Sequence, residues 1–490
     1  MNVRIRRPEL PDVLWPLRPG RTILDHLREA GLAASVHTPC GGKGTCKKCT
    51  VLVDGESKLA CIAVLSGSGD TLIELTQAKP QKIMTAGLRL RYKVDPPVAH
   101  GCGIAVDIGT TTIVLYAYDL ATGALLATAA EANRQGAYGA DVVSRMKAAE
   151  EGEETALIQT VRGQLNDMAG RVTENTTGPA AWSVTGNTVM QHFLCGLDTS
   201  GIARAPFTPA STFGGEIPAA DLGLRAAPGA ICYLTPAISG YVGGDITAAA
   251  LSCSLAAQKR PALLLDIGTN GEIALYDPQQ GLTCCATAAG PAFEGALLSC
   301  GMPALPGAVD RVWLEGGQPR YTVIGGSKPA GFCGSGLVDA LAVLLHMGLA
   351  DETGYMEDDF VLAEGVVITP QDVRQLQLAK AAIAGGIYTI LERAELSPGD
   401  VGTLFLAGGF GNYLRPQSAA DIGLFPAALL PKVKAIGNAA GAGVVAALLS
   451  KPARRHLSKL QKQARYHELS GDALFMEKYM ECMMFGDEGD

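Results

Sequence analysis

Charged and aromatic residues are scarce in this chain of 490 residues, at 18% and 6% of the total. Long apolar runs are lacking too, because none reaches the roughly 18 residues that a membrane-spanning helix needs. The longest run, 439–449, is rich in glycine and alanine and predicts a packed helix. The net charge of −8 argues against general nucleic-acid binding. We therefore expect neither a membrane span nor a nucleic-acid partner.

An export signal is also lacking, since Arg4, Arg6 and Arg7 are followed by no apolar core. We therefore expect a cytoplasmic protein, whose 13 cysteines serve as thiols or metal ligands and not as disulfides. Hydrophobic residues (48%) and glycine (60 residues) are abundant, as is typical of turn-rich α/β domains. The length allows roughly two to four domains.

The segment 263–277 is central to the sequence pattern and reads LLLDIGTNGEIALYD. Three apolar residues lead into Asp266, a tight turn begins with Gly268, Thr269 and Asn270, and an alternating run predicts a second strand. The backbone N–H groups and hydroxyls of such a turn suit a phosphate. The Asp266 carboxylate could hold Mg²⁺ directly or through water. The sequence thus predicts a phosphate-binding β-hairpin.

The same pattern occurs 159 residues earlier (266 − 107), where 104–119 reads IAVDIGTTTIVLYAYD and Asp107 matches Asp266. Two copies at domain-sized spacing predict a duplicated α/β domain whose hairpins face each other. The second set of tip residues is Gly109, Thr110, Thr111 and Thr112. A P-loop is excluded at both sites, because neither Gly-Lys-Ser/Thr nor a helix follows the turn. Two ordinary structural hairpins are the alternative.

Four cysteines in the first 78 residues have the spacing C-x5-C-x2-C-x11-C: Cys40, Cys46, Cys49 and Cys61. They follow a predicted helix at 21–31, and a predicted strand at 50–53 separates the last two. Four thiolates can hold an iron–sulfur cluster, and the plant-type spacing is close to this one. Structural zinc is the alternative, although zinc sites usually pair their ligands as two C-x2-C knuckles and only one such pair is present.

The composition divides the chain into a first unit at 1–78, a basic linker at 79–100 that ends in two prolines, and a large unit. The duplication divides the large unit into subdomains at 101–250 and 251–490. His192 lies beside apolar residues and favours a core or capping role over metal binding.

Several polar groups of the large unit lie next to glycines. Asp245 follows two glycines and leads into a helix of small residues, predicted to about residue 256, which permits close helix crossing. Glu294 is a candidate base or water-positioning group, with helix capping as an equal alternative. Gly334, Ser335 and Gly336 open a helix, as in anion sites. Gly408 and Gly409 end a predicted strand, where the backbone could approach a flat ligand such as adenosine.

Taken in order, the two hairpins, GYVGGD with its helix, LAGGFGN and GNAAGAG resemble the ASKHA superfamily of sugar and acetate kinases, heat-shock-70-type chaperones and actin. The resemblance covers about 101–450 and implies two RNase H-like subdomains that close on Mg-ATP. It implies that Asp107 and Asp266 position Mg²⁺ and water. It further implies phosphate contacts at 109–112 and 268–270, and nucleoside contacts at 334–336, 408 and 409. Asp245 and Glu294 compete for the role of hydrolysis base.

The finer motifs GNTVMQHF, AGPAFEGA and GFCGSGLVDAL, behind CGGKGTC, resemble the reductive activators of corrinoid-dependent enzymes over nearly the whole chain. The resemblance implies a β-grasp, ferredoxin-like [2Fe–2S] domain and an ATP-hydrolysing domain. Together these would reduce Co(II) to Co(I) in the corrinoid protein of an anaerobic methyltransferase system. A low-potential electron donor is implied, and a homodimer is compatible with the sequence. Family members often carry a further middle domain, where only the linker at 79–100 stands here.

Two other interpretations share the ATP-binding fold. A small-molecule kinase with a fused redox domain would phosphorylate a metabolite and need no cobalt partner. A chaperone-like clamp would only bind or unload a corrinoid protein, and its four cysteines would be structural.

Overall fold

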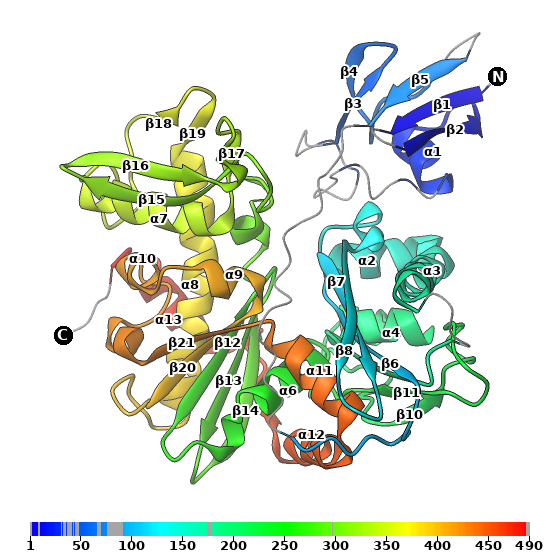
Figure 1. Cartoon of the computed structure of the whole chain (residues 1–490). Helices are drawn as coiled ribbons and strands as arrows, with labels where there is room; N and C mark the ends of the chain where they lie inside the picture. The colour runs from blue at the N-terminus through cyan, green and yellow to red at the C-terminus, as the bar shows by residue number, and fades with distance from the viewer. Residues whose placement is uncertain are drawn as a thin grey trace.

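The computed structural model describes residues 2–7, 10–30, 32, 36, 42, 44, 49–65, 70–75, 92–173, 178–295 and 297–486. It consists of a small N-terminal domain and two larger lobes (Figure 1). The N-terminal domain lies over the first lobe, and the second lobe stands beside it. In the described part of the chain, no helix has both the length and the apolar character needed to cross a membrane.

The N-terminal domain is a five-stranded sheet of order β2-β1-β5-β3-β4 with one helix, α1. The predicted helix is confirmed: Thr22 and Asp25 form a capping box at its start, and Ile23, Leu24 and Leu27 are buried. Val51 and Val53 alternate with exposed residues, as one buried sheet face requires. The elements are β1 (Asn2–Arg7), β2 (Leu10–Pro16), α1 (Ile23–Glu29), β3 (Thr50–Val53), β4 (Glu56–Leu59) and β5 (Thr71–Glu74).

The first lobe contains a six-stranded sheet of order β10-β11-β9-β6-β7-β8. Its strands are β6 (Cys102–Ile108), β7 (Thr112–Asp119), β8 (Leu125–Ala132), β9 (Ala181–Gly186), β10 (Glu216–Pro218) and β11 (Ile231–Leu234). Its helices are η2 (Arg134–Ala137), α2 (Val142–Ala148), η3 (Ala149–Glu153), α3 (Glu154–Val172), α4 (Thr188–Cys195) and α5 (Ser200–Ala203). Apolar residues of α2, α3 and α4 form one core with the sheet.

The second lobe repeats this arrangement in a sheet of order β21-β20-β12-β13-β14-β22. Its strands are β12 (Ala262–Ile267), β13 (Gly271–Asp277), β14 (Gly281–Thr287), β20 (Thr403–Ala407), β21 (Val433–Gly437) and β22 (Arg465–Tyr466). In each lobe an antiparallel meander is extended by two parallel strands: β9 and β11 beside β6, and β20 and β21 beside β12. Five strands of each sheet follow the same order, as the predicted duplication requires, whereas the sixth lies beyond β11 in the first sheet and beyond β14 in the second.

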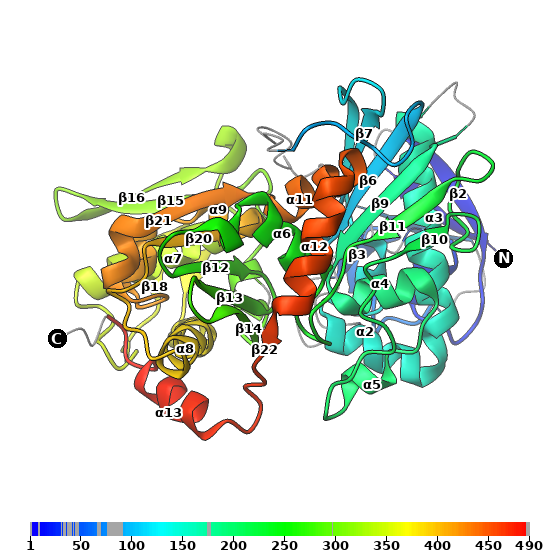
Figure 2. The ribbon, with the colours of Figure 1, turned by 90° about the horizontal axis from the view of Figure 1, so that it is seen from below.

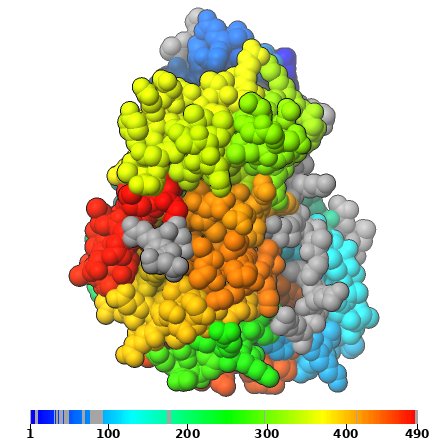
Figure 3. Space-filling model, turned by 90° about the vertical axis from the view of Figure 1, so that its left-hand side faces the viewer, coloured from blue at the N-terminus to red at the C-terminus, as the bar shows by residue number. Residues whose placement is uncertain are grey.

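Further elements of the second lobe form its core and its outer parts. They are η4 (Leu255–Ala257), η5 (Pro291–Glu294), β15 (Ala308–Glu315), β16 (Gln318–Val323), η6 (Ile324–Gly326), β17 (Gly331–Phe332), α7 (Gly334–His346), β18 (Phe360–Ala363), β19 (Val366–Ile368), α8 (Pro370–Arg393), α9 (Gly408–Tyr413), α10 (Pro416–Asp421), η7 (Ala427–Lys432) and α13 (Ala473–Glu481). Figure 3 shows the outer face of this lobe, with the yellow-green and yellow part stacked on the orange part and the red C-terminal part beside them.

Three helices lie between the lobes: α6 (Gly244–Ser252), α11 (Ala439–Leu449) and α12 (Lys451–Gln463) (Figure 2). A Cβ atom on Gly443 would lie 2.0 Å from the carbonyl oxygen of Ala248, so the predicted close crossing of small-residue helices is confirmed for α6 and α11. The predicted packed helix at 439–449 is confirmed as α11, and it packs on the first sheet through Val444, Val445 and Leu448.

Two boundaries differ from the sequence prediction. The helix after the Gly-Gly pair begins at Gly244, contains Asp245 in its first turn and ends at Ser252, well before residue 256. A short 3₁₀ helix follows it, so the chain changes direction earlier than the alanine content suggested. After β20 the chain enters the helix α9 at once and not an open turn. The linker at 79–100 lies largely outside the described residues, and its described end pairs at Asp95 with Ser450.

Candidate functional site

The two predicted hairpins end at one place between the lobes. Asp107 is the penultimate residue of β6, and Asp266 is the penultimate residue of β12. Each turn is closed by a backbone bond from its first glycine: Gly109 N–H donates to the Thr112 carbonyl at 3.0 Å, and Gly268 N–H donates to the Asn270 carbonyl at 2.9 Å. Each aspartate is therefore held between a parallel neighbouring strand on one side and the hairpin turn that follows it in the chain.

Four carboxylates come together at this point: Asp107, Asp245, Asp266 and Glu272. Burial raises the pKa of Asp107 to about 7, with a smaller increase from Asp266 and an opposing hydrogen bond from Asn438. Burial also raises the pKa of Asp266 to about 6. The pKa values of Asp245 and Glu272 are raised by burial first and then by the charges of the neighbouring carboxylates. The site therefore favours a cation.

The donor set fits Mg²⁺ held mainly through water. In the described ranges, no group of three or more His, Cys, Asp or Glu side chains is close enough to bind a metal ion alone. Mg²⁺ usually keeps several water ligands and takes one or two carboxylates plus phosphate oxygens. Carboxylate oxygens that repel one another in a partly buried space match this chemistry, because a cation would offset the repulsion.

Glu294 links the two hairpin tips. It is the last residue of η5, and its two oxygens accept hydrogen bonds from Thr111 Oγ1 at 3.2 Å and from Thr269 Oγ1 at 3.1 Å. Burial raises the pKa of Glu294, and these two hydrogen bonds oppose the increase. The carboxylate therefore bridges the tips of both lobes, and its observed donors are side-chain hydroxyls and not the N–H groups of a helix start.

Sequence reasoning missed three residues at the site. Glu272 pairs with Asp266 across the second hairpin. Asn438 caps α11 and hydrogen-bonds the Asp107 carboxylate. Arg145, fully buried, donates to the Thr110 carbonyl through Nη2 at 2.6 Å, and its pKa is lowered to about 10 by burial. The strand alternation could have indicated Glu272, and Asn438 lies in the GNAAGAG motif, but nothing local in the sequence marks Arg145.

The glycines that the sequence predicted to contact a nucleotide are of two kinds: some are packed closely against neighbouring groups, and one is open to solvent. A Cβ atom on Gly408 would lie 2.4 Å from Asp266 Oδ1, and its φ is +82°, so this glycine makes room for the aspartate. Gly409 is exposed, and a Cβ atom there would meet nothing within 4 Å. Gly334, Ser335 and Gly336 are buried in the first turn of α7, where Ser335 Oγ donates to the Asp310 carbonyl at 3.0 Å. These three pack against η5 and β15.

The cysteine site is described in part, because Cys40 and Cys46 lie outside the described residues. Cys49 and Cys61 are buried with their sulfur atoms 3.2 Å apart. This is too long for a disulfide, which needs about 2.05 Å. Gly42 and Gly44 have φ of +89° and +76°, which suits a loop that turns tightly. Two of the four predicted cysteine ligands are thus close together in the described part of the chain.

His192 belongs to the core, as predicted. It is fully buried on α4, its Nδ1 is 2.7 Å from the Thr188 carbonyl oxygen, and its Nε2 accepts a hydrogen bond from Ser211 N–H at 3.3 Å.

Comparison with known proteins identifies the family of this chain. The family model described as the C-terminal domain of RACo, the ASKHA domain, matches residues 260–490, and the model described as the RACo middle region matches residues 102–258. "Corrinoid activation enzyme RamQ" of Eubacterium limosum is 35% identical over 420 residues, which cover 79% of this chain and 70% of that protein. The chain belongs to the family of reductive corrinoid activators.

Two further members of the activator family agree with this. The "[Co(II) methylated amine-specific corrinoid protein] reductase" of Methanosarcina barkeri is 30% identical over 226 residues, 41% of this chain and 42% of that protein. A solved structure titled "Reductive activator for corrinoid,iron-sulfur protein" has a TM-score of 0.73 and 28% identity, covering 100% of this chain and 99% of that one. The family's middle region is represented here by the first lobe, whereas the sequence alone suggested that a middle domain had no counterpart.

Proposed function

We propose that this chain uses MgATP to reduce the Co(II) corrinoid protein of a methyltransferase system to Co(I), one electron at a time. The observation that carries the proposal is the meeting of two aspartate-bearing hairpins under one bridging glutamate, Glu294, in a chain whose relatives are named for corrinoid activation. The electron would enter from a low-potential donor.

The N-terminal domain would supply the redox group. When bound, a [2Fe–2S] cluster of the plant type transfers single electrons near −400 mV. Its proposed ligands are Cys40, Cys46, Cys49 and Cys61, and the proximity of the last two sulfur atoms supports that set. The tight glycine turns at Gly42 and Gly44 allow the loop to wrap a small inorganic group.

The need for ATP follows from the energy of the electron transfer. If the cobalt couple lies ~200 mV below the donor, one electron costs about 4–5 kcal/mol. A ligand can offset this only if it binds two states of the protein with different affinity. The two lobes, joined by the close crossing of α6 and α11, offer such states, because nucleotide held between the hairpins would favour one arrangement of the lobes over another.

The side chains of the site have distinct proposed roles. Asp107 and Asp266 would orient the hydrated Mg²⁺, and the tips at 109–112 and 268–270 would hold phosphates through N–H and hydroxyl groups. Glu294 would position or deprotonate the attacking water, since burial raises its pKa toward neutral pH. Asp245 competes for this role through its own raised pKa. Gly409, which is open to solvent, would lie on the nucleoside side together with Gly408.

The test is anaerobic absorbance spectroscopy of a Co(II) corrinoid protein mixed with this protein and a low-potential reductant. We expect the Co(I) band to grow only when MgATP is present. The Asp266→Ala variant should keep a reducible cluster but fail to form Co(I). Normal cobalt reduction by that variant would contradict the coupling. If no candidate corrinoid protein responds while the cluster is intact, the kinase interpretation and a metabolite screen take its place.

A further inference from the structure

Among the described residues, Arg28 makes hydrogen bonds from the N-terminal domain to the first lobe, and apolar packing accompanies them. Arg28, at the end of α1, donates from both Nε (3.1 Å) and Nη2 to the carbonyl oxygen of Ala137, and its guanidinium lies 5.2 Å from the centre of the Tyr138 ring. Ala137 is buried in the hydrophobic core of the N-terminal domain, and Tyr138 packs against it. We call this contact the Arg28 dock. It joins residues that are 109 positions apart.

The Arg28 dock lies beside the cysteine loop. A Cβ atom on Gly42 would lie 3.8 Å from Arg28 Nη2 and 3.9 Å from Cys61 Cβ. The side chain that makes the dock therefore lies close to two described residues of the cysteine site, Gly42 and Cys61. Releasing Arg28 would loosen the N-terminal domain on this side.

The lobe side of the dock is connected to the first hairpin tip. Asn133 donates from its backbone N–H to the Thr111 carbonyl at 2.8 Å and from Nδ2 to the Gly109 carbonyl at 2.9 Å. Arg145 donates to the Thr110 carbonyl between them. Three successive carbonyls of the tip are thus held by the segment 133–145, which also contains the dock. The phosphate-binding tip cannot shift without pulling on this segment.

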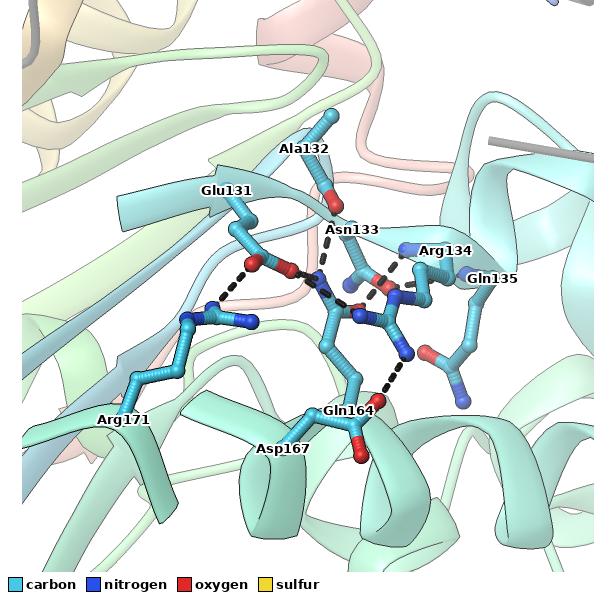
Figure 4. A network of polar contacts seen from close by, with 8 residues as sticks. All are labelled: Glu131, Ala132, Asn133, Arg134, Gln135, Gln164, Asp167 and Arg171. Atoms are coloured by element: carbon cyan, nitrogen blue, oxygen red, sulfur yellow. Dashed lines mark hydrogen bonds and ion pairs between the residues drawn. The ribbon is translucent and has the colours of Figure 1, made fainter. Parts of the chain in front are cut away.

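The segment between Asn133 and the dock is stiff. Gly136 N–H donates to the Asn133 carbonyl and Tyr138 N–H to the Gln135 carbonyl, both at 2.9 Å. Figure 4 shows how side chains fix its start to α3: Arg134 N–H donates to Gln164 Oε1 at 2.9 Å, and Arg134 Nη1 pairs with Asp167 at 2.5 Å. A displacement at Asn133 is therefore transmitted to Ala137 and is not absorbed by a slack loop.

We propose that the segment 133–138 couples the nucleotide site to the Arg28 dock, so that ATP bound between the hairpins releases the N-terminal domain. The proposal rests on the proposed function, which puts phosphates at the tips. One carboxylate, Glu294, now spans Thr111 and Thr269, so entry of a triphosphate between the tips must part them. The first tip then moves with Asn133, and the dock loses its geometry. By linkage, breaking the dock must tighten nucleotide binding by the same factor.

The experiment uses the full-length protein with intact cluster, a non-hydrolysable ATP analogue and Mg²⁺. Small-angle X-ray scattering reports the radius of gyration, and hydrogen exchange reports protection of the peptides around Arg28 and 134–138. We expect the analogue to increase the radius and to lower protection at both faces. Calorimetry should give a Kd for the analogue at least about 5-fold lower in Arg28→Ala than in the wild type. Arg4→Ala, an exposed arginine of β1, is the control and should match the wild type.

Two further variants test the route. Arg28→Lys keeps the charge but loses the two-pronged donor, so it should lie between the wild type and Arg28→Ala. Asn133→Ser keeps a side-chain oxygen that can cap the segment but is too short to bond to the Gly109 carbonyl. We therefore expect the dock to form in this variant, and the analogue to cause a smaller loss of protection there than in the wild type. The coupling alone is overturned if the analogue binds all variants with equal affinity and leaves the radius and the protection unchanged. An increase in protection would overturn it as well. An analogue that does not bind the wild type overturns the proposed function and the coupling with it.

Discussion

The two hairpins carry the same Asp-Ile-Gly-Thr start but differ by one residue in the turn. In the first, Ile108 pairs with Ile113, and Asp107 faces Val114. In the second, Ile267 pairs with Gly271, and Asp266 faces Glu272. The shorter second turn thus brings a second carboxylate opposite the aspartate. The two copies of the motif thus have different electrostatic environments, because the second combines a shorter turn with a glutamate at position 272.

The surroundings of the tips differ as well. The first tip is held on its carbonyl side by Asn133 and Arg145, and the segment that begins at Asn133 reaches the N-terminal domain at Ala137. The second turn is fixed by packing, since a Cβ atom on Gly271 would lie 2.7 Å from Thr287 Oγ1 and 2.8 Å from Ile383. The first hairpin is therefore suited to transmit a movement and the second to keep its position.

The equivalence of the two aspartates can be tested directly. We expect Asp107→Asn and Asp266→Asn each to lower ATP hydrolysis by about 100-fold or more, because each removes a charge that orients the metal and its water. Steady-state phosphate release measures this, and thermal unfolding of each variant is the control for folding. Near-normal turnover in either variant would show that only one hairpin serves the chemistry.

The bridge between the hairpins is tested by Glu294→Gln, which keeps the shape but removes the base. We expect hydrolysis to fall by about 100-fold, with binding of a non-hydrolysable analogue within about threefold of the wild type, the scatter expected for a single contact. Calorimetry and phosphate release give the two values. An equal loss in binding would mean that Glu294 holds the tips together and takes no part in the reaction.

Gly408, the glycine beside the second aspartate, leaves no space for a larger side chain. Gly408→Ala should destabilise the protein by about 1–3 kcal/mol, because the residue is left-handed and its Cβ atom would meet Asp266. Gly409→Ala is the matched control, since its Cβ atom meets nothing, and its stability should change by less than about 1 kcal/mol. Thermal unfolding measures both. Equal stability of the two variants would rule out the steric argument.

The smallest effect is expected from the carboxylate that distinguishes the second hairpin. The pKa of Glu272 is raised in the folded protein, so the folded state binds its proton more tightly and its contribution to stability declines as pH rises above about 4.5. Glu272→Gln should match the wild type in stability below pH 4.5 and be more stable than the wild type at pH 8. Unfolding under both conditions without divalent cations tests this, and a difference independent of pH would contradict it.

The sequence allowed prediction wherever a local pattern determines structure. The repeated Asp-Ile-Gly-Thr turns predicted both hairpins and the duplicated sheet, and the helix predicted at 21–31 corresponds to α1. The clustering of Asp107, Asp245 and Asp266 also followed from these motifs. Asp107 and Asp266 end strands of two separate sheets and Asp245 lies in the first turn of α6, so their proximity followed from the expectation that the two hairpins face each other.

The rest depends on contacts between distant segments. Arg145 reaches the first tip from a helix with no sequence mark, and Asn438 reaches Asp107 from the other end of the chain. The glycines of α7 also have a packing role that the sequence does not show, since a Cβ atom on Gly336 would lie 2.1 Å from the Val309 carbonyl oxygen. In the sequence Arg28 looks like any other helix residue, and its contact with Ala137 becomes visible only in the fold.

The crossing of α6 and α11 has a consequence for how the protein folds. The helix α6 follows the first sheet in the chain but packs on the second through Ile246 and Ala249, while α11 follows the second sheet and packs on the first. A fragment that ends near residue 250 would leave an apolar sheet face bare. The two lobes therefore cannot mature one after the other during synthesis, and we expect the first to wait for the last 50 or so residues before it is complete.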